Sequence, residues 1–258
     1  MKKYLHEIIK RKDLIFTLVV SGLKAQHTNT FLGYFWWILD PMLGVVVYYF
    51  LRVVLLGAAG ENIAIFLAVG LVSWRWLASV TNGSTKSISK ESSLISKVYL
   101  PKAIFPLCLN LTQVINFAFG LFVITVFLLI FRVKPTLKLF WLPYIMIVQL
   151  IFMFALSLIF AYIGAFIKDI ENVMSHIMRF WFYGSPVIWE SDRVPAQYQW
   201  VVQLNPASAL IGSYRNVFMY NQSPQFLKLN IILGVSLMVA IFMLFYYSRH
   251  EHKIIKAL

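Results

Sequence analysis

Residues 103–131 read AIFPLCLNLTQVINFAFGLFVITVFLLIF, a continuous apolar run that contains no charged residue. A helix needs about 20 consecutive apolar residues to cross the roughly 30 Å hydrocarbon layer of a membrane. The run does not alternate apolar and polar residues, as a lipid-facing strand does. This stretch therefore predicts a transmembrane helix and an all-α integral membrane fold.

Five further segments meet the same requirement, and the composition agrees with them. The 258 residues are 60% hydrophobic and 13% charged, with a mean hydropathy of +0.75, whereas soluble domains are about a quarter charged. A soluble enzyme and a disordered chain are thereby excluded as default interpretations. The six predicted spans are residues 31–56, 63–80, 103–131, 139–167, 173–189 and 227–247.

Lysine and arginine residues set the predicted orientation. With the N-terminus inside the cell, 14 of the 23 fall in inside segments, 6 in outside segments and 3 within spans. Basic residues accumulate on the cytoplasmic side of the inner membrane, so both termini are expected in the cytoplasm, although the basic loop 132–138 opposes the rule. The same bias accounts for a pI near 9.8 without a nucleic-acid partner. The first thirty residues lack the features of a secretory signal.

Residues 1–30 predict an amphipathic helix that lies on the membrane surface. Asp13, Thr17, Ser21, Lys24 and Thr28 recur at steps of three or four residues and form one narrow polar stripe. Apolar residues fill much of the remaining surface, and a basic triplet precedes them, as in interfacial helices. The alternative is a short extension of the first span.

Residues 82–102 form the most polar internal stretch of the chain. Asn82–Gly83 predicts a break, Ser84 is suited to cap a helix that begins there, and Pro101 separates the segment from the third span. A short, basic, serine-rich helix on the cytoplasmic face is suited to docking a partner. The alternative is a solvated loop that only enforces the topology.

Residues 185–226 are too many and too apolar for an ordinary outer loop. Pro186, Pro195, Pro206 and Pro224 cut this region into pieces shorter than a span. Such pieces predict helices that re-enter the outer leaflet and turn back, which is tolerated where the backbone is buried in protein. The alternative is a pair of helices lying flat on the outer surface.

Of the charged residues within the spans, Asp40, Arg75 and Arg179 all fall in the inner half of the membrane at a rise of about 1.5 Å per residue. Because an unpaired charge is costly at that depth, Asp40 is expected to pair with Arg75 or Arg179. The pair either holds helices together or contacts a substrate. Arg52 is expected to extend its side chain to the outer surface.

Aromatic residues cluster at several points along the spans. Most are expected in interfacial belts, and the alternative is a stacking surface for sugars or polyols along a substrate path. The candidates for that path are Tyr34, Trp36, Trp37, Phe180, Trp181 and Tyr183.

The sequence contains no set of residues with evident chemistry. It has no phosphate-binding G-x-x-x-x-G-K-[ST] loop, no catalytic triad, and no cysteine or histidine cluster with metal-ligand spacing. We therefore expect no cofactor and no metal in this chain, which is expected not to be an enzyme. If it moves a solute uphill, a partner must supply the energy.

Four strings, in order along almost the whole chain, resemble a known family. They are Leu32-Gly33-x-x-Trp36-x-x-Leu39-x-Pro41; Leu94-Ile95-x-Lys97-Val98-Tyr99-x-Pro101 running on to Phe105-Pro106-Leu107; Lys168-Asp169-Ile170 followed by Ser185-Pro186-Val187; and Asn205-Pro206 followed by Tyr214-Arg215. The family is the membrane subunit of ABC-2 type exporters, in the group that handles bacterial surface polysaccharides. The chain departs from it at Lys168-Asp169 and Ser21-Gly22, where the family often has Arg-Asp.

The resemblance implies a mechanism and its partners. Two copies would surround a conduit above two nucleotide-binding subunits, which would hold ATP and Mg²⁺. The helix at residues 84–100 would be a coupling element seated on the ATPase, with the contact residues Lys90, Glu91, Ser92, Ser93, Leu94, Ile95 and Lys97. The re-entrant pieces would narrow the exit, with Pro206, Tyr214 and Arg215 as an outer gate.

The substrate implied by the resemblance is a lipid-linked polymer. Overall likeness favours wall teichoic acid, and the alternatives are an O-antigen or a capsular chain. A membrane-embedded transferase acting on lipid-linked sugars, and a secondary transporter or channel, are the readings from other classes. The predicted organisation is a single transmembrane domain, residues 1–258, divided at 1–30, 31–81, 82–102, 103–189, 190–226 and 227–258.

Overall fold

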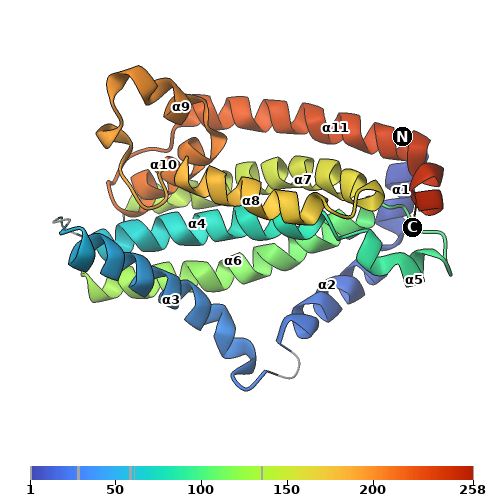
Figure 1. The fold of residues 1–258 in the computed structure, drawn as a ribbon, viewed down its shortest axis with the longest axis horizontal. Helices are drawn as coiled ribbons and strands as arrows, with labels where there is room; N and C mark the ends of the chain where they lie inside the picture. Colours follow the sequence, from blue (N-terminus) through green and yellow to red (C-terminus); the bar gives the residue numbers. More distant parts are fainter. Residues whose placement is uncertain (1, 28–29, 58–59, 61, 135, 258) are drawn as a thin grey trace.

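The computed structural model describes residues 2–27, 30–57, 60, 62–134 and 136–257, and these residues contain helices but no strand (Figure 1). The predicted all-α membrane fold is confirmed. The α-helices are α1 (Lys2–Lys10), α2 (Lys12–His27), α3 (Trp36–Tyr49), α4 (Ile63–Ser84), α5 (Ser92–Ile95), α6 (Ile104–Ile130), α7 (Leu142–Phe166), α8 (Ile170–Tyr183), α9 (Gln199–Leu204), α10 (Pro206–Phe218) and α11 (Phe226–Ala257).

Five helical stretches of the described chain are long and apolar enough to cross a membrane. They are Gly33–Leu55, which joins α3 to a six-residue π-helix, Ile63–Ser84, Ile104–Ile130, Leu137–Phe166 and Phe226–Ile254. Figure 1 shows both chain termini near α1 and α5, at what we call the terminal end of the bundle, with α9 at the opposite, distal end.

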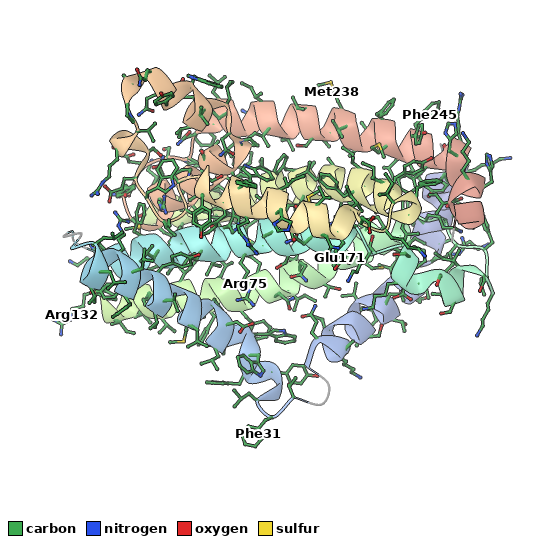
Figure 2. All side chains as sticks on the ribbon, viewed as in Figure 1. Phe31, Arg75, Arg132, Glu171, Met238 and Phe245 are labelled. Carbon is green, nitrogen blue, oxygen red and sulfur yellow. The ribbon has the colours of Figure 1, made fainter. Side chains whose placement is uncertain are left out.

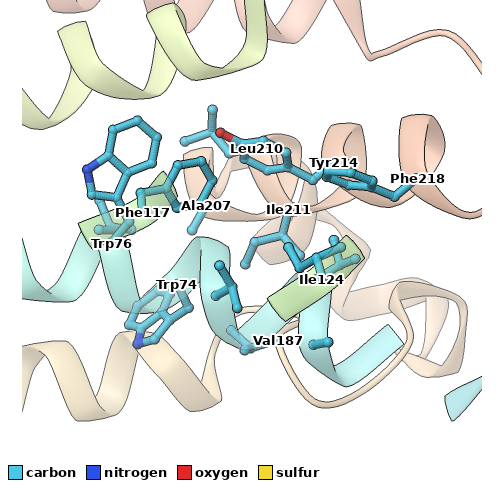
Figure 3. Close-up of a cluster of buried hydrophobic side chains, with 14 of the residues drawn as sticks. Trp74, Trp76, Phe117, Ile124, Val187, Ala207, Leu210, Ile211, Tyr214 and Phe218 are labelled. Atoms are coloured by element: carbon cyan, nitrogen blue, oxygen red, sulfur yellow. The ribbon is translucent and has the colours of Figure 1, made fainter. Parts of the chain in front are cut away.

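Helix α4 forms the centre of the bundle. It contacts α3, α6, α7, α8 and α10. In its most apolar stretch of 18 residues 78% are buried, whereas the figure is 17% for both Gly33–Leu55 and α11. Close approach depends on glycine: a Cβ atom added to Gly120 of α6 would lie 2.5 Å from Val72 of α4. Figure 3 shows the resulting core, in which Trp76 and Phe117 meet α10 at Ala207.

The fifth predicted span, residues 173–189, is shorter in the structure. Helix α8 has 14 residues, about 21 Å at 1.5 Å per residue, which is too short to cross the bilayer alone. It ends at Tyr183 because Gly184 and Ser185 lead into Pro186, which lacks an N–H and disfavours helical backbone before it. The chain then continues without regular helix through Val187.

The N-terminal region forms two helices rather than one. Helices α1 and α2 are separated at Arg11, and α2 packs on α6. The predicted polar stripe of Asp13, Thr17, Ser21 and Lys24 is exposed on α2, while its last member, Thr28, lies outside the described residues. The opposite side of α2 contributes the buried Val19 to the core at the terminal end.

The predicted helix at residues 84–100 does not form. Instead α4 continues through Asn82–Gly83 to Ser84, and the loop holds only a 3-10 turn and the four-residue α5. Gly83 does not break α4 because it is the contact point with α6, where an added Cβ would lie 3.2 Å from Leu109. Ser84 donates to the Thr81 carbonyl at 2.7 Å and caps no helix.

Residues 190–226 contain one helix that inserts into the bundle and one that does not. Helix α10 packs against α4, α7 and α11, and Leu210, Ile211 and Tyr214 lie in the core (Figure 3). Helix α9 lies at the surface, with Trp200 and Leu204 exposed. Helix α10 therefore enters the bundle, as the re-entrant prediction requires, whereas α9 stays at the bundle surface.

Candidate functional site

An ion pair joins α3 to α4 within the apolar bundle. Arg75 Nη2 donates to Asp40 Oδ2 at 2.6 Å, and about half of each side chain is exposed. The predicted pairing of Asp40 is thus confirmed, with Arg75 as its partner. Arg179 is exposed on α8, where it makes no ion pair with another described residue. Figure 2 shows Arg75 on the side of the bundle where α2 and α3 lie.

Two cavities flank this ion pair. The four-helix cavity, of about 200 Å³, is lined by residues of α2, α3, α4 and α6: Gln26, Trp37, Asp40, Pro41, Val72, Arg75, Trp76, Ser79, Gln113, Asn116, Phe117 and Gly120. The two-helix cavity, of about 270 Å³, is lined by residues of α3 and α4: Asp40, Pro41, Gly44, Leu71, Trp74, Arg75, Ala78, Ser79 and Asn82. The ion pair and Ser79 belong to both walls, so they separate the two spaces.

The aromatic residues predicted for a substrate path do not gather at one place. Trp37 lines the four-helix cavity, while Tyr34, Phe180 and Tyr183 are exposed and Trp36 is half-buried. Trp181 turns into the bundle, where its ring meets Trp74 edge-on at 5.7 Å and its Nε1 donates to Asn205 Oδ1 at 2.9 Å. Trp181 therefore has a clear role in packing α8 against α4 and α10.

Asn205 organises the start of α10. Its Oδ1 accepts the backbone N–H of Ala207 at 3.0 Å, which caps the helix that Pro206 begins. Its Nδ2 donates to the Ser185 hydroxyl at 2.8 Å. The Asn205-Pro206 motif thus ties the inserted helix to the end of α8.

Arg215 is buried in the distal half of the bundle. Its guanidinium donates to the carbonyls of Pro186 and Val187, both at 2.6 Å, and to the carbonyl of Phe66 at 3.3 Å. The guanidinium carbon also lies 3.4 Å from the centroid of the Phe66 ring. Tyr214 beside it is fully buried. Because Tyr214 and Arg215 are buried, neither side chain can line an exit directly within one chain. They can influence an exit only by fixing the position of residues 186–187 and of α4.

Arg52 does not extend to the surface as predicted. It is buried, and it donates to the Ile188 carbonyl at 3.2 Å and to the Glu190 carboxylate at 2.6 Å. The guanidinium does not need to reach the surface, because Glu190 compensates its charge inside the protein. Arg193 donates to the same carboxylate at 3.0 Å. Partial burial opposes ionisation of Glu190, but these hydrogen bonds outweigh it and lower the pKa.

The predicted contact residues on the 82–102 loop differ in exposure. Lys90, Ser93 and Lys97 are exposed, Glu91, Ser92 and Leu94 are half-buried, and Ile95 is buried as the anchor of the loop. Lys86 forms an ion pair with Glu171 that fixes the start of the loop to α8. The loop therefore presents a basic surface on a fixed base.

A buried carboxylate that the sequence analysis missed fixes the other end of this loop. Glu251 of α11 accepts hydrogen bonds from Tyr4 at 3.2 Å, from Tyr99 at 2.8 Å and from the backbone N–H of Lys102. Burial, followed by the bond to Glu251, raises the pKa of Tyr99 to about 12. The sequence does hold one indication of this site: Glu251 is a single acidic residue between Arg249 and Lys253. A lone carboxylate in a basic segment indicates a specific hydrogen-bonding partner.

The described residues offer no site for a metal ion, since no three His, Cys, Asp or Glu side chains come together in them. What the arrangement provides is a pair of polar cavities inside an apolar bundle and a basic, anchored loop at its terminal end. Charged residues inside a membrane bundle mark solute pathways.

Comparisons with known proteins agree with the resemblance. The family described as ABC-2 type transporter matches residues 13–219. An O-antigen export system permease protein RfbA of Klebsiella pneumoniae is 32% identical over 208 residues, 80% of each chain. A permease of the same name from Myxococcus xanthus is 28% identical over 241 residues, 93% of each chain.

These relatives do not support the expectation of teichoic acid and fit the O-antigen alternative better. The match covers most of the chain, including the helices that line both cavities and α10, which carries Arg215. With its membrane-spanning helices, the protein is a multi-pass membrane subunit of a transporter, and it belongs to the ABC-2 type transporter family.

Proposed function

We propose that this chain is the permease subunit of an ATP-driven exporter that moves a lipid-linked polysaccharide of the O-antigen type across the cytoplasmic membrane. The observation that carries the proposal is the likeness, over 80–93% of the chain, to permeases named for O-antigen export. Polar cavities at an intramembrane ion pair support it, because a polar polymer needs such groups along an apolar path.

The energy comes from two copies of a separate nucleotide-binding subunit, which holds ATP and Mg²⁺. It binds at the terminal end, where the exposed Lys90, Ser93 and Lys97 offer a basic contact surface. Lys86 links this loop to α8, and Glu251 links it to α1 and α11. A displacement of the loop by the ATPase is therefore transmitted to three helices. This end faces the cytoplasm, in agreement with its excess of basic residues.

A second copy of the chain completes the conduit. The span Gly33–Leu55 is only 17% buried, and it exposes Val46, Val47 and Val54 along one side. Two copies that meet near α3 would enclose the two-helix cavity, which α3 and α4 leave open in a single chain. The distal segment held by Arg215 would then narrow the outer end of the conduit.

The experiment is co-expression of the chain with an ATPase subunit of the same family, purification, and reconstitution into liposomes that contain lipid-linked O-polysaccharide. We expect a stable complex and ATP-dependent exposure of the polysaccharide on the opposite leaflet. Replacing Lys90 and Lys97 together by glutamate should abolish complex formation, whereas Lys134→Glu, at an exposed position between α6 and α7, is the control. Nucleotide hydrolysis by the chain alone, or sugar transfer in place of export, would refute the proposal.

A further inference from the structure

The four-helix cavity has the features of a binding site for an uncharged polar ring. Trp37, Trp76 and Phe117 supply flat apolar surfaces, and Trp76 and Phe117 stack at 4.2 Å. Three amides also line the cavity: Asn116 Nδ2 donates to Gln26 Oε1 and to Gln113 Oε1, both at 3.0 Å. Ligand sites combine apolar walls with a few placed polar groups in this way.

Two polar atoms of residues that line this cavity lack a hydrogen-bond partner among the described residues. Trp76 is only 3% exposed, and its Nε1 donor is buried without a hydrogen bond. Asn116 Oδ1 is a buried acceptor in the same condition. Since buried polar groups in proteins are nearly always satisfied, each such atom calls for an explanation. One donor on α4 and one acceptor on α6 suit a ligand that both accepts and donates hydrogen bonds, as a hydroxyl group does.

The charge of the cavity lining favours a neutral ligand over an anionic one. Asp40 and Arg75 are the only charged residues in its described lining, and their pairing leaves the wall neutral. A phosphate would have to compete with Asp40 for the guanidinium and would approach a carboxylate. A neutral sugar ring meets no such cost, and it stacks its C–H faces on the aromatic rings.

We propose that the four-helix cavity binds one neutral sugar ring of the exported polymer, beside the Asp40–Arg75 pair. This inference rests on the proposed function and narrows its substrate to polymers that contain uncharged sugars. The ion pair and Ser79 then separate the bound ring from the two-helix cavity.

The test uses the full chain in lipid nanodiscs and needs no nucleotide. Cys108 is the only cysteine and is buried, so Ser79→Cys in a Cys108→Ser background places one reactive thiol on the cavity wall. Its labelling by a small maleimide is timed with neutral trisaccharides of glucose, mannose or galactose, or with a glycerol phosphate trimer. We expect at least one neutral trisaccharide to slow labelling about tenfold at about ten times its Kd, and the phosphate trimer to leave it unchanged.

Trp76→Phe keeps the ring stack and removes the donor, so it should raise the sugar concentration for half-protection about three- to tenfold. Asn116→Leu is a second variant with the same expectation, and Trp141→Phe, outside the cavity, should change nothing. Protection by the phosphate trimer alone, by a monohexosyl diacylglycerol alone, or by no compound overturns the inference. If only this inference is wrong, the liposome assay still shows ATP-dependent export. If the proposed function is wrong, that assay shows no export.

Discussion

The spans Gly33–Leu55 and Ile63–Ser84 have the same mean hydropathy, 1.8, but 17% of the first and 78% of the second is buried. One is a peripheral helix and the other is the centre of the bundle. Lipid tails are as apolar as a protein core, so hydropathy cannot separate the two in a membrane. The difference comes from side-chain size and from where polar groups find partners.

Small residues make the central position of α4 possible. Ala64, Ala68 and Gly70 recur along its distal half, and Gly70 lies directly against the Val187 carbonyl and Arg215. Two of its hydroxyl groups are satisfied within the helix, as Ser73 donates to the Val69 carbonyl and Thr81 to the Leu77 carbonyl. Helix α3 has larger side chains, and its glycine, Gly44, has no neighbour within 4 Å of an added Cβ.

The largest effect on the packing of α4 is expected from removal of Arg215, which links α4 to residues 186–187. Arg215→Met keeps much of the side-chain length but leaves the carbonyls of Pro186 and Val187 without a donor. We expect a loss of about 3–5 kcal/mol in the free energy of unfolding, as for other broken buried polar networks. Denaturant unfolding in detergent measures it, and the exposed Arg179→Met serves as control. A loss below 1 kcal/mol would contradict the anchoring role.

A direct comparison of the two spans uses their glycines. In Gly70→Ala the new Cβ would lie 2.4 Å from the Val187 oxygen, and overpacking of this kind costs about 1–3 kcal/mol. Gly44→Ala on α3 meets no neighbour and should stabilise its helix slightly, because alanine has the higher helix propensity. Thermal unfolding of the two variants in the same detergent measures the difference. Equal melting temperatures would mean that α4 is no more tightly packed than α3.

The sequence predicted the features that follow from the energetics of the bilayer. Five spans were recognised because continuous apolar runs have one stable form in lipid, and the partner of Asp40 was narrowed to two candidates because charges at equal depth must pair. The insertion of α10 followed from prolines that divide an apolar region.

Other features depend on contacts that hydropathy does not encode. Asn82–Gly83 looks like a break, but Gly83 is a packing contact within α4. The burial of Arg52 depends on Glu190, which is 138 residues away, and the Glu251 bonds bring together residues separated by up to 247 positions. No local pattern reveals such partners, and the same holds for the contacts of Trp181 with Trp74 and Asn205.

The distal end of α3 is held by a pH-sensitive contact. The pKa of Glu190 lies below its ordinary value because Arg52 and Arg193 bind its ionised form. Its contribution is therefore complete above the unfolded-state pKa and is lost as the pH falls through the lower, folded-state pKa. We expect Glu190→Gln to destabilise the protein by about 1 kcal/mol at neutral pH, since the carboxylate is 41% exposed. Melting curves from neutral to acidic pH should show the two proteins converging as Glu190 is protonated; a gap that persists there would assign the effect to packing.

The smallest expected effect concerns the only ion pair between the two spans among the described residues. Asp40 and Arg75 are half-exposed, and pairs of this kind contribute about 0–1 kcal/mol. A double-mutant cycle with Asp40→Asn and Arg75→Gln, read by unfolding, should therefore give a coupling energy of at most about 1 kcal/mol. Export should respond more strongly than stability, because the pair forms the wall between two cavities. A coupling of 3 kcal/mol or more with unchanged export would show instead that the pair serves only to hold α3 against α4.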